Sequence, residues 1–120
     1  MPRSTEELMK LNLHGVFGER DRAKRLAVIS EIWATDGVFI DPEGRHSGYA
    51  ALDEAVESLL RRFPEFVFVE REPLDAFHGL GRLGWGFGPA GQEPAVTGLD
   101  VVVVAGERIT ALYTFLDKPK

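Results

Sequence analysis

Two aspartates occur where the surrounding residues make a carboxylate unusual. Asp41 follows the apolar pair Phe39 and Ile40 and precedes Pro42, so it ends a short predicted strand at a turn. Asp100 directly precedes four consecutive valines in a predicted central strand, where a charge is costly unless it is paired or protonated. Carboxyl groups in poorly solvated surroundings hold protons more tightly and are useful proton acceptors or donors. Both residues are therefore candidates for acid–base chemistry.

Each aspartate also has a structural explanation, and at this level both explanations stay open. Aspartate is the preferred first residue of a type I turn, which residues 41–44 fit, and its side chain can bond the backbone two residues on. Asp100 could accept a hydrogen bond from Thr97, Tyr113 or an arginine near the end of its strand.

The elements that must position these residues change character at Pro64. Before it, apolar spacing predicts a helix from Ser4 or Thr5 to about His14, a second from Asp21 to Gly37, and a third that begins at Ser47 or Gly48. After it, a period of two predicts four strands in residues 66–69, 83–87, 96–104 and 109–116. We expect one α+β domain over residues 1–120, with helices covering one face of a mainly antiparallel sheet.

Several other residues are candidates for a ligand pocket. Leu83, Trp85 and Phe87 share one face of a strand, which predicts either core packing or the wall of a cavity. The alternating glycines on the opposite face, at positions 84, 86 and 88, predict a strongly bent strand or the close approach of a second subunit. His14 could reach a cavity beside the first helix, and His46 could hydrogen-bond Asp41 across the turn.

Composition narrows the function. The 120 residues contain no cysteine, which excludes disulfides, thiolate metal sites and cysteine nucleophiles. The three histidines lie on different predicted elements without metal-ligand spacing, so we expect no metal. The net charge of −5 argues against nucleic acid and anionic membranes as partners, and no apolar stretch is long enough to span a membrane. We expect a cytoplasmic protein.

Four segments in order carry a resemblance to a known superfamily: residues 36–44, 47–52, 97–101 and 109–115. Together they resemble the nuclear transport factor 2-like superfamily, in particular its SnoaL-like branch. The resemblance implies a cone-shaped α+β barrel, in which three N-terminal helices cover a curved sheet around one apolar cavity. This scaffold hosts steroid isomerases, polyketide cyclases, epoxide hydrolases, dehydratases and non-catalytic proteins, so it implies where a site lies and not which reaction occurs.

The resemblance also implies roles for individual residues. Asp41 falls at the position of the general base of the ketosteroid isomerases, and Asp100 at that of their protonated oxyanion donor. Phe17 falls where those enzymes carry a tyrosine donor, so half of the expected oxyanion hole is missing. Tyr113, Tyr49, Trp33 or Trp85 would have to supply the missing donor.

We therefore predict an isomerase, cyclase or hydrolase that needs no cofactor. The alternative is a non-catalytic homodimer that binds a small apolar ligand. The expected dimer contact is the outer sheet face, and the residues expected to line the cavity are Phe17, Trp33, Leu83, Trp85, Phe87, Tyr113 and His14.

Overall fold

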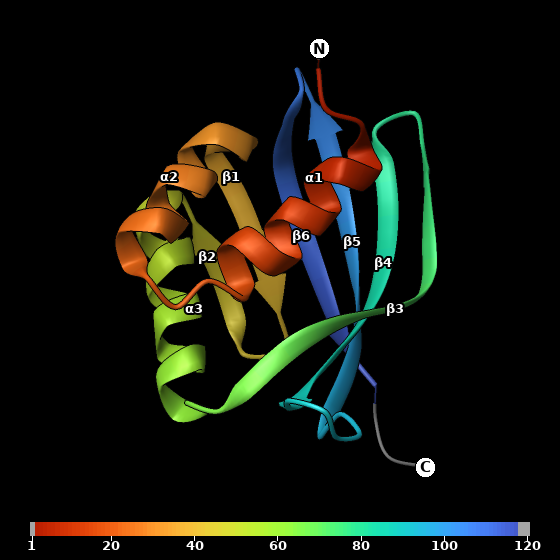
Figure 1. Cartoon of the computed structure of the whole chain (residues 1–120). Helices are drawn as coiled ribbons and strands as arrows, with labels where there is room; N and C mark the ends of the chain where they lie inside the picture. Colours follow the sequence, from red (N-terminus) through yellow and green to blue (C-terminus); the bar gives the residue numbers. More distant parts are fainter. Residues whose placement is uncertain (1, 118–120) are drawn as a thin grey trace.

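The computed structural model describes residues 2–117, and these residues form a curved six-stranded sheet with helices on its concave face (Figure 1). The helices are α1 (Thr5–Leu11), which continues as the π-helix η1 (Asn12–Phe17), α2 (Arg22–Ile32) and α3 (Tyr49–Arg62). The strands are β1 (Trp33–Asp41), β2 (Gly44–Ser47), β3 (Phe66–Phe77), β4 (Leu80–Pro89), β5 (Val96–Ala105) and β6 (Arg108–Leu116). The α+β architecture and the four-strand meander expected from the sequence are confirmed.

The sheet has the order β2-β1-β6-β5-β4-β3. Its neighbouring strands are antiparallel except for β1 and β6, which run parallel. That parallel pair joins the first strand of the chain to the last, so the early hairpin β1–β2 and the later meander form one sheet.

Among residues 2–117, no helix combines the length and the apolarity that a membrane crossing requires.

The predicted helix starts agree with the structure. Ser4 caps α1 by accepting a hydrogen bond from the backbone N–H of Glu7 at 3.1 Å, and the Glu7 side chain accepts one from the Ser4 N–H at 3.0 Å. Asp21 caps α2 by accepting from the backbone N–H of Lys24 at 3.1 Å. Gly48 precedes α3 with a φ of 86°, a conformation that favours glycine.

Two predicted helix ends were wrong. The first helix does not stop near His14, because η1 carries it on to Phe17. The second ends at Ile32 and not at Gly37, because Trp33 is already extended and begins a nine-residue strand that pairs with β6. The sequence also gave no sign of β2, whose four residues lack an alternating apolar pattern.

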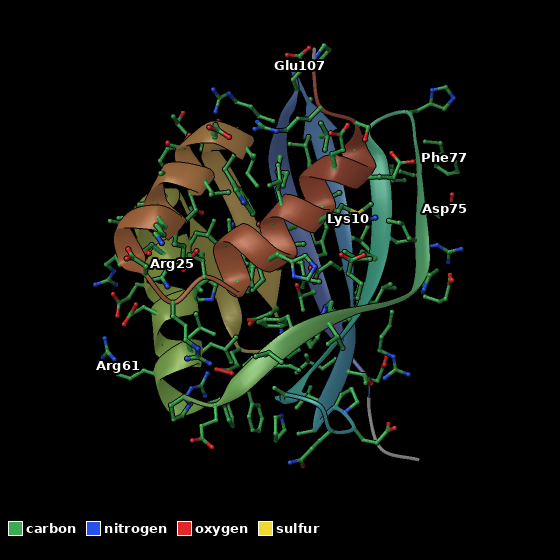
Figure 2. All side chains as sticks on the ribbon, viewed as in Figure 1. Lys10, Arg25, Arg61, Asp75, Phe77 and Glu107 are labelled. Carbon is green, nitrogen blue, oxygen red and sulfur yellow. The ribbon has the colours of Figure 1, made fainter. Side chains whose placement is uncertain are left out.

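The core lies between the helices and the concave face of the sheet (Figure 2). Helix α1 crosses β4, as the close approach of Met9 to Gly81 shows: a Cβ on that glycine would lie 2.7 Å from the methionine methyl group. The fully buried side chains at the centre of this core are Leu8, Met9, Leu13, Val16, Ile29, Ile32, Trp33, Leu52, Val56, Leu83, Val102, Ile109 and Leu112.

The alternating glycines of β4 are explained by the chain itself. A Cβ on Gly86 would lie 2.6 Å from Cγ of Pro94, and a Cβ on Gly88 would lie 2.7 Å from the backbone nitrogen of Ala95. The segment between β4 and β5 therefore folds back over the outer face of β4, and only glycine leaves room for it. The close approach that the glycine pattern predicted comes from the same chain.

Candidate functional site

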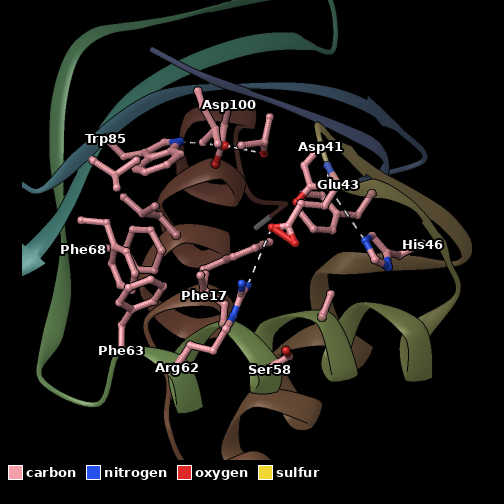
Figure 3. Close-up of a pocket in the computed structure, with 18 of the residues that line it drawn as sticks. Phe17, Asp41, Glu43, His46, Ser58, Arg62, Phe63, Phe68, Trp85 and Asp100 are labelled. Atoms are coloured by element: carbon pink, nitrogen blue, oxygen red, sulfur yellow. Dashed lines mark hydrogen bonds and ion pairs between the residues drawn. The ribbon is translucent and has the colours of Figure 1, made fainter. Parts of the chain in front are cut away.

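A cavity of about 740 Å³ lies between α3, η1, the β1–β2 turn and the concave face of the sheet (Figure 3). Its volume is within the usual range for small-molecule sites, and its wall is mainly apolar and aromatic. Charged side chains gather near the turn and along α3. The lining residues are Leu13, Phe17, Phe39, Asp41, Glu43, His46, Ala51, Glu54, Ala55, Ser58, Leu59, Arg62, Phe63, Phe68, Trp85, Phe87, Val96, Asp100, Thr114 and Leu116.

Asp100 is buried in the cavity wall, with 5% of its surface exposed. Its Oδ1 accepts hydrogen bonds from the indole N–H of Trp85 at 3.0 Å and from the hydroxyl of Thr114 at 2.8 Å. Within residues 2–117, no donor bonds its Oδ2. The wall thus fixes one carboxyl oxygen through two hydrogen bonds.

The environment of Asp100 raises the pKa of its carboxyl group towards neutral pH. Burial disfavours the charged form and raises the pKa of Asp100 from 3.8 to about 6, although the hydrogen bonds from Thr114 and Trp85 act in the opposite direction. A carboxyl group with such a pKa can change its protonation state during a reaction at physiological pH.

Asp41 performs the structural role of the turn and also lines the cavity. Its Oδ1 accepts hydrogen bonds from the backbone N–H groups of Glu43 and Gly44, both at 3.0 Å. Asp41 pairs with Gly44 in the sheet register, so this is a two-residue hairpin turn. Its side chain is 23% exposed and belongs to the cavity wall. The two explanations that the sequence left open for Asp41 are therefore compatible.

His46 lies beside Asp41 without the hydrogen bond that the sequence suggested. Its Nε2 is 4.0 Å from Oδ1 of Asp41, which is too long for a hydrogen bond. The imidazole stacks on the ring of Phe39, with centroids 5.4 Å apart. His46 therefore forms part of the cavity mouth.

Three of the residues expected in the cavity line it: Phe17, Trp85 and Phe87. Phe17 packs edge-to-face on Phe39 and on Phe68, with ring centroids 5.2 and 6.3 Å apart. The residue that stands where a tyrosine donor was expected thus contributes a hydrocarbon ring to the wall.

Two other expected residues lie on the outside. Tyr113 is 39% exposed on the outer face of β6, because neighbouring strand residues point to opposite faces and Thr114 takes the inner one. His14 is about half exposed, and its Nε2 lies 2.7 Å from Oε2 of Glu70. Leu13 and Phe17 occupy the cavity side of η1, so His14 points away from the cavity.

Trp33 and Leu83 belong to the closed core and not to the cavity wall. Trp33 lies at the opposite end of β1 from Asp41, and its indole N–H donates to Oδ1 of Asn12 at 2.9 Å. Leu83 faces inward like Trp85 but is completely buried near α1, which covers this end of β4. These positions correct the prediction that both side chains reach a ligand.

The tyrosines and tryptophans considered as replacement donors have other tasks. The hydroxyl of Tyr49 donates to the carbonyl oxygen of Trp33 at 2.6 Å, and the N–H of Trp85 donates to Asp100. With Tyr113 on the outer face, none of them presents a donor to the cavity.

Helix α3 contributes more to the cavity than the sequence analysis recognised. Its lining residues recur at intervals of three and four, which places them on one face of the helix. Their shared spacing was the available signal, but several are apolar, and apolar residues at helical spacing more often belong to the core than to a ligand site. The lining residues of this segment are Ala51, Glu54, Ala55, Ser58, Leu59, Arg62 and Phe63.

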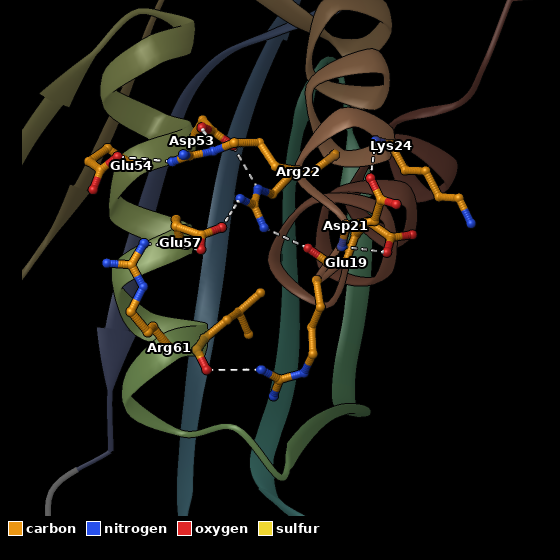
Figure 4. Close-up of polar contacts among 11 residues, drawn as sticks. Glu19, Asp21, Arg22, Lys24, Asp53, Glu54, Glu57 and Arg61 are labelled. Carbon is orange, nitrogen blue, oxygen red and sulfur yellow. Dashed lines mark hydrogen bonds and ion pairs between the residues drawn. The ribbon is translucent and has the colours of Figure 1, made fainter.

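A buried ion-pair cluster holds α3 against α2 (Figure 4). Arg25 is fully buried and donates to Oδ1 of Asp53 at 2.8 Å, to Oε1 of Glu57 at 2.6 Å and to the carbonyl oxygen of Glu19 at 2.7 Å. The side chains of Asp53 and Glu57 project from α3 towards α2. The cluster fixes the helix that carries one wall of the cavity.

Arg20 fixes the end of that wall. It donates to the carbonyl oxygens of Leu60, Phe63 and Phe66 at 2.9, 2.8 and 2.7 Å. These carbonyls lie at the C-terminal end of α3 and the start of β3, where a cation is favourable.

Within residues 2–117, no three histidine, aspartate or glutamate side chains lie close enough together to hold a metal ion.

No known family model matches the sequence, and no curated protein matches it either. Solved structures do match. A candidate isomerase of the SnoaL-like family from Agrobacterium tumefaciens str. C58 is 24% identical, with a TM-score of 0.85, and the match covers 92% of this chain and 95% of that one. A candidate SnoaL-like polyketide cyclase from Jannaschia sp. CCS1 is 14% identical, with a TM-score of 0.76, covering 98% and 91%. The chain has the nuclear transport factor 2-like fold.

A third match with this fold is a candidate ketosteroid isomerase from Kribbella flavida DSM 17836, which is 13% identical with a TM-score of 0.73. It covers 97% of this chain and 79% of that one. The fold that the sequence resemblance implied is therefore confirmed. Because the matching proteins are named for different reactions, the nuclear transport factor 2-like fold places the site without naming its chemistry.

Proposed function

We propose that the cavity catalyses proton transfer on a small apolar substrate, as an isomerase, a cyclase or a hydrolase does. The observation that carries the proposal is that Asp41 and Asp100 line the same cavity, each with Oδ1 held by donors. Within residues 2–117, no hydrogen bond reaches the Oδ2 of either residue. The names of the matching structures, isomerases and a polyketide cyclase, support this class of reaction.

In the proposed mechanism, Asp41 is the base and Asp100 the acid. Asp41 takes a proton from a carbon next to a carbonyl group, and the electron pair of the broken C–H bond moves to the carbonyl oxygen. The protonated form of Asp100, which predominates below about pH 6, donates a hydrogen bond to that oxygen as its negative charge develops. Return of the proton from Asp41 to another carbon completes an isomerisation. In a hydrolase, Asp41 would take the proton from water instead.

Apolar walls strengthen this chemistry. The rings of Phe17, Phe68 and Phe87 line the same cavity as the two carboxyl groups, and electrostatic interactions are stronger in apolar surroundings than in water. Phe17 offers no hydroxyl, so the proposed oxyanion site has one donor from Asp100 and requires a second from another residue.

A turnover screen tests the proposal. Wild-type protein is incubated with an enone, an epoxide and an ester of one- to three-ring size, next to Asp41→Asn, Asp100→Asn and the control Asp36→Asn, whose exposed side chain lies outside the cavity wall. We expect turnover by the wild type and the control, and a loss of about 100-fold or more in Asp41→Asn. Wild-type rates in Asp41→Asn would contradict the proposal. Tight binding without turnover would favour the alternative, a non-catalytic ligand-binding module.

We also propose that two copies of the chain associate through the outer face of the sheet. Val69 is 44% exposed, Tyr113 39% and Phe115 59%, and these side chains lie on the face opposite the cavity. Exposed apolar area of this kind on a sheet commonly marks an interface. The dimer would leave both cavities open, because the contact and the cavity lie on opposite faces.

A further inference from the structure

Two hydrogen-bond donors on α3 face the cavity mouth. Ser58 and Arg62 are four residues apart, so they lie on the same side of the helix, and both line the cavity. Figure 3 shows Arg62 extending from α3 towards Glu43 on the other side of the mouth. They are donors that the catalytic proposal does not use.

The donors of both residues are available. Within residues 2–117, neither the hydroxyl of Ser58 nor the guanidinium of Arg62 makes a hydrogen bond. Arg62 pairs with Oε2 of Glu43 at 3.8 Å, beyond hydrogen-bond length, and both side chains are more than half exposed. An exposed pair at this distance contributes little stability, so a ligand can replace Glu43 at small cost.

The guanidinium also has a defined place. Its central carbon lies 5.9 Å from the centre of the Phe63 ring, and Phe63 lines the same cavity. A cation over an aromatic ring is held in a restricted region without using its N–H donors. Arginine at such a position recognises carboxylates through two parallel hydrogen bonds.

We propose that Ser58 and Arg62 bind a carboxylate of the ligand, so that the substrate is an apolar ring compound with an acidic group at one end. The acid would lie at the mouth against α3, while the apolar body would fill the aromatic part of the cavity and reach Asp100. This inference rests on the proposed function, because it takes the ligand bound by Ser58 and Arg62 to be the substrate of the proposed reaction.

The acidic residues of the cavity lead to the opposite expectation, that the ligand is a cation. Asp41, Glu43 and Glu54 also lie near the mouth, and together they would favour a cationic ligand. Glu54, however, already accepts a hydrogen bond from Arg22 at 2.9 Å, and Asp41 accepts two from the turn. The charge preference of the ligand therefore decides between the α3 donors and the rim carboxylates.

The experiment is calorimetric titration of the wild-type protein at pH 7.5 with three ligands of one shape: 2-naphthoate, 2-naphthamide and 2-naphthylmethylammonium. Arg62→Gln and Ser58→Ala are titrated in parallel. Arg61→Gln is the matched control, because Arg61 lies next in sequence, points away to bond Glu57 at 3.2 Å and does not line the cavity.

We expect 2-naphthoate to bind at least about fivefold more tightly than the amide, and Arg62→Gln to remove that preference while Arg61→Gln keeps it. Glu43→Gln should strengthen binding of the acid, because it removes the competing anion. Equal affinity for acid and amide, tighter binding of the ammonium compound, or an equal loss in Arg61→Gln would overturn the proposal.

Failure of this proposal is distinguishable from failure of the catalytic one, because the titration measures equilibrium binding. Carboxylate selectivity without any turnover would leave the α3 site standing and refute acid–base catalysis. Turnover that is lost in Asp41→Asn, together with equal affinity for 2-naphthoate and 2-naphthamide, would do the reverse.

Discussion

Replacing Asp100 with asparagine should stabilise the protein at neutral pH and have little such effect in acid. Burial raises the pKa of Asp100 to about 6 from 3.8, so ionisation of this carboxyl group in the folded protein is unfavourable. Asparagine keeps the shape and can still accept hydrogen bonds from Trp85 and Thr114 through its oxygen. The substitution therefore removes the charge while it preserves the contacts.

The sign and size of the effect follow from linkage. Because the folded pKa is higher than the unfolded one, wild-type Asp100 contributes stability that is full below about pH 4 and is lost as pH rises through about 6. The two values differ by about two pH units, which corresponds to roughly 3 kcal/mol in total. Between pH 4.5 and 7.5, the free energy of unfolding of Asp100→Asn should rise relative to wild type by roughly 2 kcal/mol.

Urea denaturation of both proteins at several pH values between 4.5 and 7.5 measures this difference directly. Titration of the Asp100 carboxyl carbon by NMR provides an independent midpoint, expected near pH 6. Thr114→Val should move that midpoint upward, because it removes a hydrogen bond that lowers the pKa of Asp100. A stability difference that does not change with pH, or a midpoint near 4, would refute the reasoning.

Three further changes test the scaffold and the dimer. Arg25→Met should lower the free energy of unfolding by about 2–3 kcal/mol, since it removes three hydrogen bonds of a buried guanidinium and leaves Asp53 paired with Arg22 alone; urea melts measure this, and a change below about 1 kcal/mol would contradict it. Arg20→Met should cost about 1–2 kcal/mol through three lost carbonyl contacts, and an unchanged midpoint would count against this role. Phe115→Glu should convert the proposed dimer into a monomer in sedimentation velocity; a wild type that is already monomeric would exclude the dimer.

Much of the fold could be predicted because local signals and the superfamily resemblance agreed. The caps at Ser4 and Asp21 gave helix starts, and the change from helical to alternating spacing after Pro64 gave the four-strand meander. The end of the second helix could not be predicted. Residues 33–37 have no strong strand pattern, and only Trp33 among them pairs with β6, which lies far along the chain, before the regular pairing resumes at Val38.

The positions of site residues were predicted best where the sequence of a single strand or turn determines them. The shared face of Trp85 and Phe87 followed from strand alternation, and the turn at Asp41 from its residue types. The hydrogen bond between Asp100 and Trp85 could not be predicted, since it depends on how β4 lies beside β5. The sequence analysis did not single out Arg62 as a site residue, because only the folded chain brings the end of α3 to the β1–β2 turn.

The measurement that tests the central claim most directly is deuterium exchange into a ligand of the cavity. Wild-type protein and Asp41→Asn are incubated in deuterated water with cyclic ketones, and incorporation next to the carbonyl group is followed by NMR. This detects proton abstraction by Asp41 without knowledge of the final product. The account predicts incorporation with wild-type protein, well above the protein-free rate, and near-background incorporation with Asp41→Asn. Equal incorporation by the two proteins would contradict it.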